Sequence, residues 1–222
     1  MFDSISGRYD LLNRVLSLGI DIQWRRRVLK RLKPYAPQRI LDVATGTGDL
    51  AIGLLQLDPG EVIGLDLSPG MLAQADLKVR RKGLSSKIKL IEGDSEQLPF
   101  EQASFDAVTV AFGVRNFEHL EQGLSEMARV LKIGGQIAIL EFSRSRVPFV
   151  APLFKLYFHH ILPTLGRWVS RDASAYTYLP ASVQAFPEGR EFLQILEKSG
   201  FSLARQERLT FGICSLYTAQ KL

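Results

Sequence analysis

The sequence predicts an α/β fold with a mostly parallel sheet, because short apolar segments alternate with helical segments from residue 39 onward. A glycine-rich turn follows the first apolar segment, and an acidic residue closes the second. The expected strands are 39–44, 61–66, 87–92, 105–111, 136–142, 201–209 and 213–222, and the expected helices are 49–57, 69–82, 118–131 and 188–199. The last two strands are expected to form a hairpin that turns at Phe211-Gly212.

Local signals set several of these boundaries. Ser68 is a natural N-cap for the helix 69–82, and Gly200 is a typical end for the helix 188–199. We expect Gly134-Gly135 to form a turn before the strand 136–142. Residues 8–33 are predicted to be helical with a break at Gly19.

Composition indicates a soluble globular chain of one domain, with 46% hydrophobic and 23% charged residues. The single cysteine, Cys214, excludes an intrachain disulfide. We expect a cytoplasmic protein, because the N-terminus lacks the pattern of a signal peptide and no apolar segment is long enough to span a bilayer.

The net charge of +5 is concentrated near the N-terminus, where residues 1–40 hold nine basic and three acidic residues. Such a segment suits nucleic acid or an anionic membrane surface, and it is equally typical of a solvated helix face. Residues 143–187 interrupt the strand–helix alternation with prolines and aromatic residues. Their apolar part, 147–169, could line an apolar channel, lie on a membrane surface or pack onto the sheet.

The turn Thr45-Gly46-Thr47-Gly48-Asp49 is the first candidate site. Its glycines let the backbone turn sharply and approach a ligand, and the helix that follows presents free N–H groups. Asp66, at the end of the next strand, can accept hydrogen bonds from a ribose. These features predict a cofactor that contains a nucleoside.

Two cofactor classes fit this turn, because Gly46–Ala51 also satisfies the dinucleotide fingerprint of NAD-dependent oxidoreductases. Asp49 stands where a pyrophosphate would lie, and its charge favours a cationic cofactor without phosphate. Asp42 adds a second acid near the turn. We therefore favour S-adenosylmethionine over NAD.

Two further strand ends carry polar residues. Gly93-Asp94-Ser95 follows the third expected strand, where an acid can bind the adenine amino group. Ala111-Phe112-Gly113-Val114-Arg115-Asn116 leaves the fourth, and ligands in open α/β sheets bind beyond such ends. Arg115 stays protonated and would stabilise an oxyanion. No His/Cys/acid cluster has metal-ligand spacing, so no metal is expected.

Together these residues resemble the ubiquinone/menaquinone-biosynthesis C-methyltransferase family, of the demethylmenaquinone methyltransferase type, over almost the whole chain. The matching segments are Phe2–Ile5, Arg8–Asp10, Ser17–Gly19, Leu41–Asp49, Phe112–Asn116, Leu140–Ser143 and Tyr176–Val183. The glycine turn is common to many methyltransferases. The Arg115-Asn116 and Tyr176–Pro180 segments are specific to this family.

The resemblance implies a class I S-adenosylmethionine-dependent methyltransferase fold of seven strands, the last antiparallel, with an N-terminal helical cap and a helical insertion before the last two strands. Its expected parts are the cap 1–38, the cofactor-binding core 39–142, the insertion 143–187 facing substrate or membrane, and the C-terminal helix and hairpin 188–222. The expected cofactor-binding residues are Thr45, Gly46, Gly48, Asp66, Leu67, Asp94, Ser95 and Ala111. Some members carry serine where this chain has Ala111, which leaves no side-chain hydrogen bond there.

The resemblance also implies C-methylation of the ring of a prenylated quinol, with demethylmenaquinol favoured over a polyprenyl benzoquinol. Deprotonation of a ring hydroxyl would activate the adjacent carbon, with the oxyanion stabilised by Arg115, which Asn116 would steer. The candidate catalytic residues are Arg115, Asn116, Tyr9 and Asp10, and the candidate substrate-binding residues are Phe112, Tyr176 and Tyr178. The proton acceptor is left open among water, Tyr9-Asp10 and Asp172.

The partners expected from these inferences are the quinol, a transient membrane surface and a possible second copy of the chain, with no nucleic acid. Four rival functions remain: another small-molecule S-adenosylmethionine methyltransferase, an NAD-dependent oxidoreductase, a nucleic-acid-binding module and an RNA or protein methyltransferase. The last would leave the segment 147–169 and the Arg115-Asn116 pair less well explained.

Overall fold

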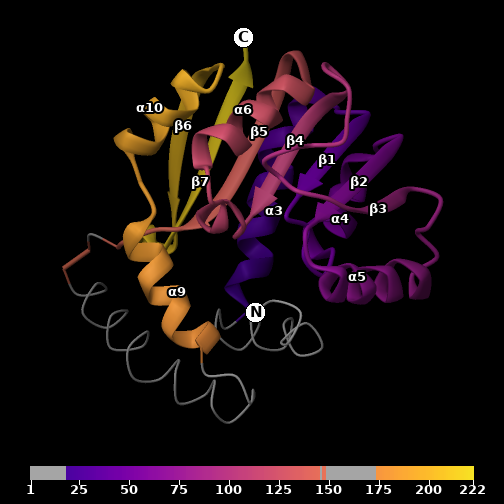
Figure 1. The fold of residues 1–222 in the computed structure, drawn as a ribbon, viewed down its shortest axis with the longest axis horizontal. Coiled ribbons are helices and arrows are strands. Elements are labelled where there is room, and N and C mark those ends of the chain that lie inside the picture. The colour runs from indigo at the N-terminus through magenta and orange to yellow at the C-terminus, as the bar shows by residue number, and fades with distance from the viewer. Residues whose placement is uncertain (1–18, 146, 149–173) are drawn as a thin grey trace.

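The computed structural model describes residues 19–145, 147–148 and 174–222. They form one sheet flanked by helices, and the sheet has seven strands in the order β3-β2-β1-β4-β5-β7-β6 (Figure 1). The strands are β1 Arg39–Val43, β2 Glu61–Asp66, β3 Ile88–Glu92, β4 Phe105–Ala111, β5 Leu131–Phe142, β6 Phe201–Leu209 and β7 Cys214–Lys221. The α-helices are α3 Ile20–Leu32, α4 Asp49–Leu54, α5 Pro69–Arg81, α6 Leu120–Val130, α9 Ser174–Ala185 and α10 Arg190–Lys198.

The strands β1 to β5 pair in parallel, and β7 runs antiparallel to both β5 and β6. This topology confirms the predicted fold class, including the hairpin at the end of the chain. The hairpin turns through the 3-10 segment Thr210–Gly212, which contains the expected Phe211-Gly212.

Two hydrophobic layers cover the two faces of the sheet. One layer contains α3, α4 and α5, whose buried side chains meet alternate strand residues such as Ile40 and Ala107. The other contains α6 and α10, which pack on Leu41, Val108 and their neighbours. Because successive strand residues face opposite sides, nearly continuous apolar strands are buried on both faces.

Several predicted boundaries are confirmed. The strands 61–66, 105–111 and 201–209 have the expected limits. Ser68 caps α5, since its hydroxyl accepts a hydrogen bond from the Met71 backbone N–H at 3.2 Å. Gly200 follows α10 with a φ of +96°, a conformation that glycine adopts without a steric penalty.

The expected turn at Gly134-Gly135 is wrong. β5 runs without interruption from Leu131 to Phe142, and its pairing with β4 shifts register instead: Phe105 pairs with Leu131, and Ala107 pairs with Gln136. The extra residues of β5 form an irregularity in which Gly134 has a φ of +78°. The glycines therefore lie at an irregularity within one strand, which pairs with β4 both before them, at Leu131, and after them, at Gln136.

The helix expected at 118–131 is also shorter. α6 begins at Leu120, because Phe117 is extended and the His119 backbone N–H donates to the Glu96 carboxylate at 2.9 Å. The expected helix 49–57 is α4 followed by the 3-10 turn Leu55–Leu57. These ends follow tertiary contacts that local sequence signals do not contain.

The carboxyl ends of β1 to β5 lie along one edge of the sheet, because these strands are parallel. The segments that carry the predicted site leave from this edge. α9 lies beyond it and contacts the 3-10 turn Val114–Asn116 that follows β4 (Figure 1). The fold thus gathers residues that are far apart in the sequence.

Candidate active site

The turn after β1 is tied to the end of β2 by two hydrogen bonds, and a third fixes the carboxylate at that end. The Thr45 N–H donates to the Leu65 carbonyl at 3.0 Å, and the Gly46 N–H donates to Asp66 Oδ2 at 2.7 Å. Asp66 Oδ1 accepts from the Ser68 N–H at 2.9 Å. Two backbone donors on different segments therefore fix the orientation of the Asp66 carboxylate.

Asp42 lies under this turn and is 1% exposed. Its two oxygens accept hydrogen bonds from the hydroxyls of Thr45 and Thr109, both at 2.6 Å. Burial raises the pKa of Asp42 to about 6, although the two hydroxyls lower it. Asp42 thus supports the turn from inside the sheet, and the Thr45 hydroxyl, expected to meet the cofactor, donates to Asp42.

Asp49 is paired, which removes the charge argument used to choose between cofactors. Lys78 on α5 lies 2.6 Å from its carboxylate, and Arg25 on α3 lies 4.0 Å away. Lys78 also donates to the Thr47 hydroxyl at 3.0 Å. These contacts fasten the turn to two helices, and the neutralised carboxylate does not by itself disfavour a phosphate.

The two glycines of the turn have different surroundings. Gly46 has a φ of +57°, and a Cβ there would meet no atom within 4 Å, so this face of the turn is open. Gly48 has a φ of +80°, and a Cβ there would come within 3.2 Å of the Ala75 side chain. Gly48 therefore allows α5 to pack closely, while Gly46 leaves space for a bound group.

The segment after β3 places Asp94 beside Asp66. The Gly93 N–H donates to the Asp66 carbonyl at 3.1 Å, and Asp94 accepts from the Glu96 N–H at 2.8 Å. Asp94 is exposed, and Leu67, which follows Asp66, is 70% exposed. Two carboxylates and an exposed apolar side chain thus stand at neighbouring strand ends, a set suited to a ribose, an adenine amino group and an adenine ring face.

Arg115 is held in a buried ion pair. Its Nη1 lies 2.8 Å from Glu141 of β5, and the two side chains are 6% and 0% exposed. The same guanidinium donates to the Phe112 carbonyl, and its Nε is buried with no hydrogen-bond partner among the described residues. Asn116 was expected to steer Arg115, whereas the structure holds the guanidinium through Glu141 and the Phe112 carbonyl. This anchoring is therefore a property of the tertiary structure.

Phe112 belongs to an aromatic cluster beside the predicted site. Its ring centre lies 4.7 Å from that of Phe142 and 6.0 Å from that of Trp24. Phe112 has a φ of +60°, which turns the chain sharply as it leaves β4 at the partly buried Ala111. The cluster supplies an apolar wall next to Arg115, whose guanidinium lies 5.7 Å from the Phe142 ring.

Asn116 and Tyr178 are brought together from distant parts of the chain. The Tyr178 hydroxyl on α9 donates to the Asn116 amide oxygen at 3.0 Å. Tyr176 also belongs to α9. The predictions for Tyr9, Asp10 and Asp172 fall outside the described residues, as does most of the apolar segment 147–169.

Glu141 is a site residue that sequence reasoning did not assign. It is fully buried, and it accepts hydrogen bonds from the backbone N–H groups of Arg115 and Phe142 as well as from the Arg115 side chain. The sequence signal that could have identified Glu141 is a single acidic residue within the apolar segment 137–142. A buried carboxylate requires a partner, and Arg115 was a nearby candidate on the neighbouring strand end.

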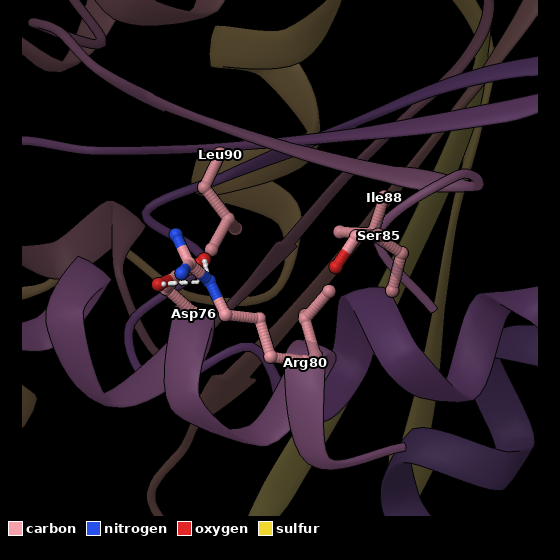
Figure 2. A pocket seen from close by; sticks show the side chains of 6 residues that line it. Asp76, Arg80, Ser85, Ile88 and Leu90 are labelled. Carbon is pink, nitrogen blue, oxygen red and sulfur yellow. Dashed lines mark hydrogen bonds and ion pairs between the residues drawn. The ribbon is translucent and has the colours of Figure 1, made fainter. Parts of the chain in front are cut away.

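A cavity of about 450 Å³ lies elsewhere, between α5 and the edge strand β3 (Figure 2). It is lined by Asp76, Val79, Arg80, Ser85, Ile88 and Leu90, none of which is a predicted site residue. Within the described part of the chain, no group of three or more His, Cys, Asp or Glu residues is placed to hold a metal ion. No helix among those residues is long and apolar enough to cross a membrane.

Solved structures with this architecture include a SAM-dependent methyltransferase from Aquifex aeolicus, with a TM-score of 0.64 at 18% identity over 89% of each chain. A putative methyltransferase from Haloferax volcanii, solved with its Trm112 activator, has a TM-score of 0.68 at 17% identity, covering 100% of this chain and 97% of that one. At these identities the likeness shows the fold.

Closer relatives are found by sequence. The demethylmenaquinone methyltransferase of Bacteroides fragilis is 51% identical over 100% of this chain and 91% of its own length. That of Thermus thermophilus is 45% identical over 100% of both chains. The ubiquinone/menaquinone biosynthesis C-methyltransferase UbiE of Geobacter sp. is 45% identical over 100% of this chain and 94% of its own.

The sequence profile of the ubiE/COQ5 methyltransferase family matches residues 1–221. The match therefore includes the glycine turn, the ends of β2 to β5 and the residues of α9. With relatives of 45–51% identity along the full chain, the protein belongs to the ubiE/COQ5 methyltransferase family.

Proposed function

We propose that this protein transfers a methyl group from S-adenosylmethionine to a ring carbon of demethylmenaquinol, which yields menaquinol. The full-length identity of 51% and 45% to two demethylmenaquinone methyltransferases carries this proposal. The rival oxidoreductase shares only the glycine turn and Asp66. A family match over residues 1–221 therefore outweighs that local pattern.

The described residues fit the cofactor. Asp66, braced by two backbone donors, would hold the ribose hydroxyls, and the exposed Asp94 would accept from the adenine amino group. Leu67 would cover the adenine ring, and the open face of Gly46 would admit the amino acid part. Thr45, Gly48, Ser95 and Ala111 complete the proposed binding residues.

S-adenosylmethionine supplies an electrophilic methyl group on a sulfonium. Removal of the proton from a ring hydroxyl would place negative charge on that oxygen and on the adjacent carbon, which could then accept the methyl group and afterwards lose its own proton to restore the aromatic ring. The protein must therefore stabilise negative charge on the ring oxygen. Arg115 is suited to this role, because Glu141 fixes its guanidinium and its Nε has no partner among the described residues. That N–H is our proposed donor to the ring oxygen.

Asn116 and Tyr178 would position the quinol, because their hydrogen bond closes one side of the site between the turn after β4 and α9. Phe112, within its aromatic cluster, would pack against the ring, and Tyr176 is a further candidate on the same helix. Tyr9 and Asp10 remain candidates for the proton acceptor, together with Asp172 and water.

A polyprenyl benzoquinol is the second candidate substrate, since the Geobacter relative is a ubiquinone/menaquinone biosynthesis enzyme. The greater identity to demethylmenaquinone methyltransferases favours the naphthoquinol. A direct assay distinguishes the two substrates: purified protein is incubated with S-adenosylmethionine and each quinol, and the methylated products are identified by mass spectrometry. Methylation of only the benzoquinol would overturn our assignment, and methylation of neither would overturn the proposed function.

We also propose transient contact with an anionic membrane surface, where a prenylated quinol resides. The support is weaker than the sequence suggested, because Arg25, Arg27 and Arg31 of α3 are paired with Asp21 and Glu207. The exposed Arg26, Lys30 and Lys33 are the cations of this region with no ion pair among the described residues. Flotation with anionic liposomes at low salt tests the contact, and absence of binding would contradict it.

A further inference from the structure

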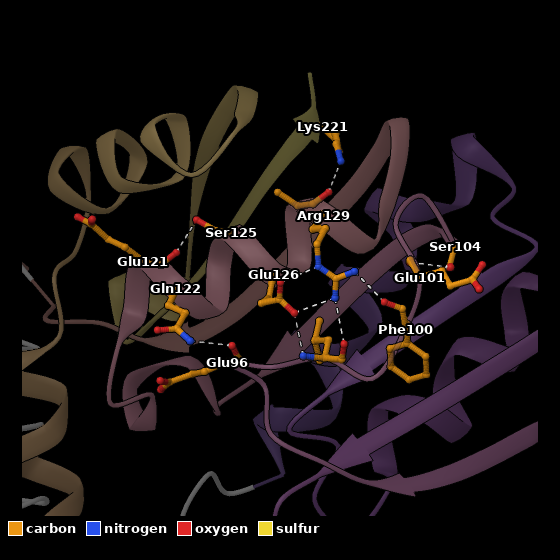
Figure 3. Close-up of polar contacts among 12 residues, drawn as sticks. Glu96, Phe100, Glu101, Ser104, Glu121, Gln122, Ser125, Glu126, Arg129 and Lys221 are labelled. Carbon is orange, nitrogen blue, oxygen red and sulfur yellow. Dashed lines mark hydrogen bonds and ion pairs between the residues drawn. The ribbon is translucent and has the colours of Figure 1, made fainter.

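The segment that carries Asp94 and Ser95 is fastened to one helix, α6, along most of its length. Near its start, the Gln122 amide donates to the Glu96 carbonyl at 3.0 Å. Near its end, the Ala103 and Ser104 N–H groups donate to the last carbonyls of α6 at 3.0 and 2.8 Å. Figure 3 shows the side chains of Gln122, Glu126 and Arg129 reaching from α6 to the segment 96–104.

An ion pair forms the centre of this attachment. Arg129 binds Glu126 through two nitrogens at 2.6 and 2.8 Å, three residues earlier on the same helix. Arg129 also donates to the carbonyls of Leu98 at 3.0 Å and Phe100 at 2.7 Å. Glu126 in turn accepts from the Leu98 N–H at 2.9 Å. The pair thus binds three backbone groups of the segment after β3.

The chemistry of this pair is specific to arginine. A guanidinium presents several N–H donors in a fixed plane, so it can bind a carboxylate and two carbonyls at once, which a lysine ammonium does less well. The hydrogen bond from Arg129 lowers the pKa of Glu126, which keeps this carboxylate charged at neutral pH. Helix α6 itself is anchored in the core by Leu124 and Met127, both fully buried.

We propose that Arg129 and Glu126 are positioning residues for S-adenosylmethionine, which hold the segment after β3 so that Asp94 and Ser95 stand against the adenine. This inference rests on the proposed function. Neither residue touches the cofactor in this arrangement; both act through Leu98 and Phe100, which follow Asp94 by four and six residues. Loss of the pair releases the segment and weakens cofactor binding without disturbing Arg115.

The test is Arg129→Ala, with the dissociation constant for S-adenosylhomocysteine measured by calorimetry and the methyl transfer measured at varied cofactor. We expect the dissociation constant and the KM for S-adenosylmethionine to rise about tenfold, as expected for loss of charged hydrogen bonds, with kcat unchanged at saturating cofactor. A purely structural loss would lower the active fraction and leave this KM unchanged.

Arg80→Ala is a matched control. Arg80 forms an ion pair with Asp76 one turn earlier on α5, but its side chain is 72% exposed and, among the described residues, it is paired with Asp76 alone (Figure 2). We expect the KM of the Arg80→Ala variant for S-adenosylmethionine to equal that of the wild type. Glu126→Gln, a milder change whose amide oxygen can still accept from Leu98, is expected to raise the KM about threefold.

Three results would overturn the inference: an unchanged affinity in folded Arg129→Ala and Glu126→Gln, an equal KM shift in Arg80→Ala, or a lower kcat with an unchanged KM. Failure of the wild-type protein to bind S-adenosylhomocysteine would overturn the proposed function and this inference with it. Wild-type binding together with unaffected variants would overturn this inference alone.

Discussion

The Tyr178 hydroxyl donates to the Asn116 amide oxygen across 62 residues of sequence, which joins α9 to the turn that follows β4. α9 therefore contributes directly to the proposed quinol site.

Tyr178→Phe tests this link. Removal of the Tyr178 hydroxyl deletes its hydrogen bond to the Asn116 amide oxygen, so we expect the KM for the quinol to rise about fivefold. The affinity for S-adenosylhomocysteine should be unchanged, because Asp66 lies at the end of β2 and Asp94 in the segment after β3. Tyr35→Phe, at an exposed tyrosine outside the site, is the control and should match the wild type.

The Arg115–Glu141 pair is expected to stabilise the folded protein and, through Arg115, to accelerate methyl transfer. Arg115→Met should lower kcat about 100-fold, the typical effect of removing a group that stabilises a developing oxyanion. Glu141→Gln leaves an uncompensated buried cation and should reduce the free energy of unfolding by about 3 kcal/mol in a denaturant titration.

The double variant distinguishes these effects. Arg115→Met with Glu141→Gln removes both charges, so we expect its stability to recover beyond that of Glu141→Gln while its kcat stays low. A kcat for Arg115→Met within a few-fold of the wild type would disprove the electrostatic role.

Asp42 should make the free energy of unfolding fall as the pH rises, which is the opposite of the usual effect of a carboxylate. Its pKa rises from 3.8 to about 6 on folding, so the native state holds the proton more tightly than the unfolded chain. The resulting contribution to the free energy of unfolding is fully present below pH 3.8 and is lost as the pH rises through about 6, at a cost of about 3 kcal/mol.

Asp42→Asn removes that titration and can still bond to both threonine hydroxyls. Relative to the variant, the wild type should therefore lose about 3 kcal/mol of unfolding free energy between about pH 3 and pH 7. The difference between the two proteins is the quantity to measure, since carboxylates with lowered pKa values, such as Asp106 and Glu126, change in the opposite sense. A constant difference across this range would refute the assignment.

Gly113 allows the turns after β1 and β4 to meet. A Cβ at this position would lie 2.5 Å from the Ala44 Cβ and 3.3 Å from Val110. Gly113→Ala should therefore lower the free energy of unfolding by about 2 kcal/mol. Gly53→Ala is the comparison: its Cβ would meet its nearest neighbour at 3.9 Å, and a helical alanine should be neutral or stabilising.

Gly46 and Gly83 separate ligand binding from backbone strain. Both have a positive φ, of +57° and +67°, and a Cβ at either would meet nothing within 4 Å. Alanine should cost each protein about 1 kcal/mol of stability. Only Gly46→Ala should also raise the dissociation constant for S-adenosylhomocysteine, at least about tenfold by calorimetry, because its Cβ would fill the proposed binding face. Equal affinities would exclude Gly46 from the site.

Sequence patterns determined much of the fold, because the relevant signals are local. Alternation of apolar segments with helices specified the parallel strands, and the N-cap Ser68 and the helix-ending Gly200 marked helix boundaries that the structure confirms. Where pairing partners decide the outcome, the patterns failed. Gly134-Gly135 forms an irregularity inside β5 because Leu131 already pairs with Phe105 of β4.

By itself, the sequence determined the family and the cofactor turn, since both depend on contiguous motifs such as Thr45–Asp49 and Phe112–Asn116. Only the tertiary structure decided which charges are paired. Lys78 neutralises Asp49, which removed the charge argument against a phosphate, and Glu141 holds Arg115. Such pairs join residues on different strands and helices, and no local spacing encodes the distance between them.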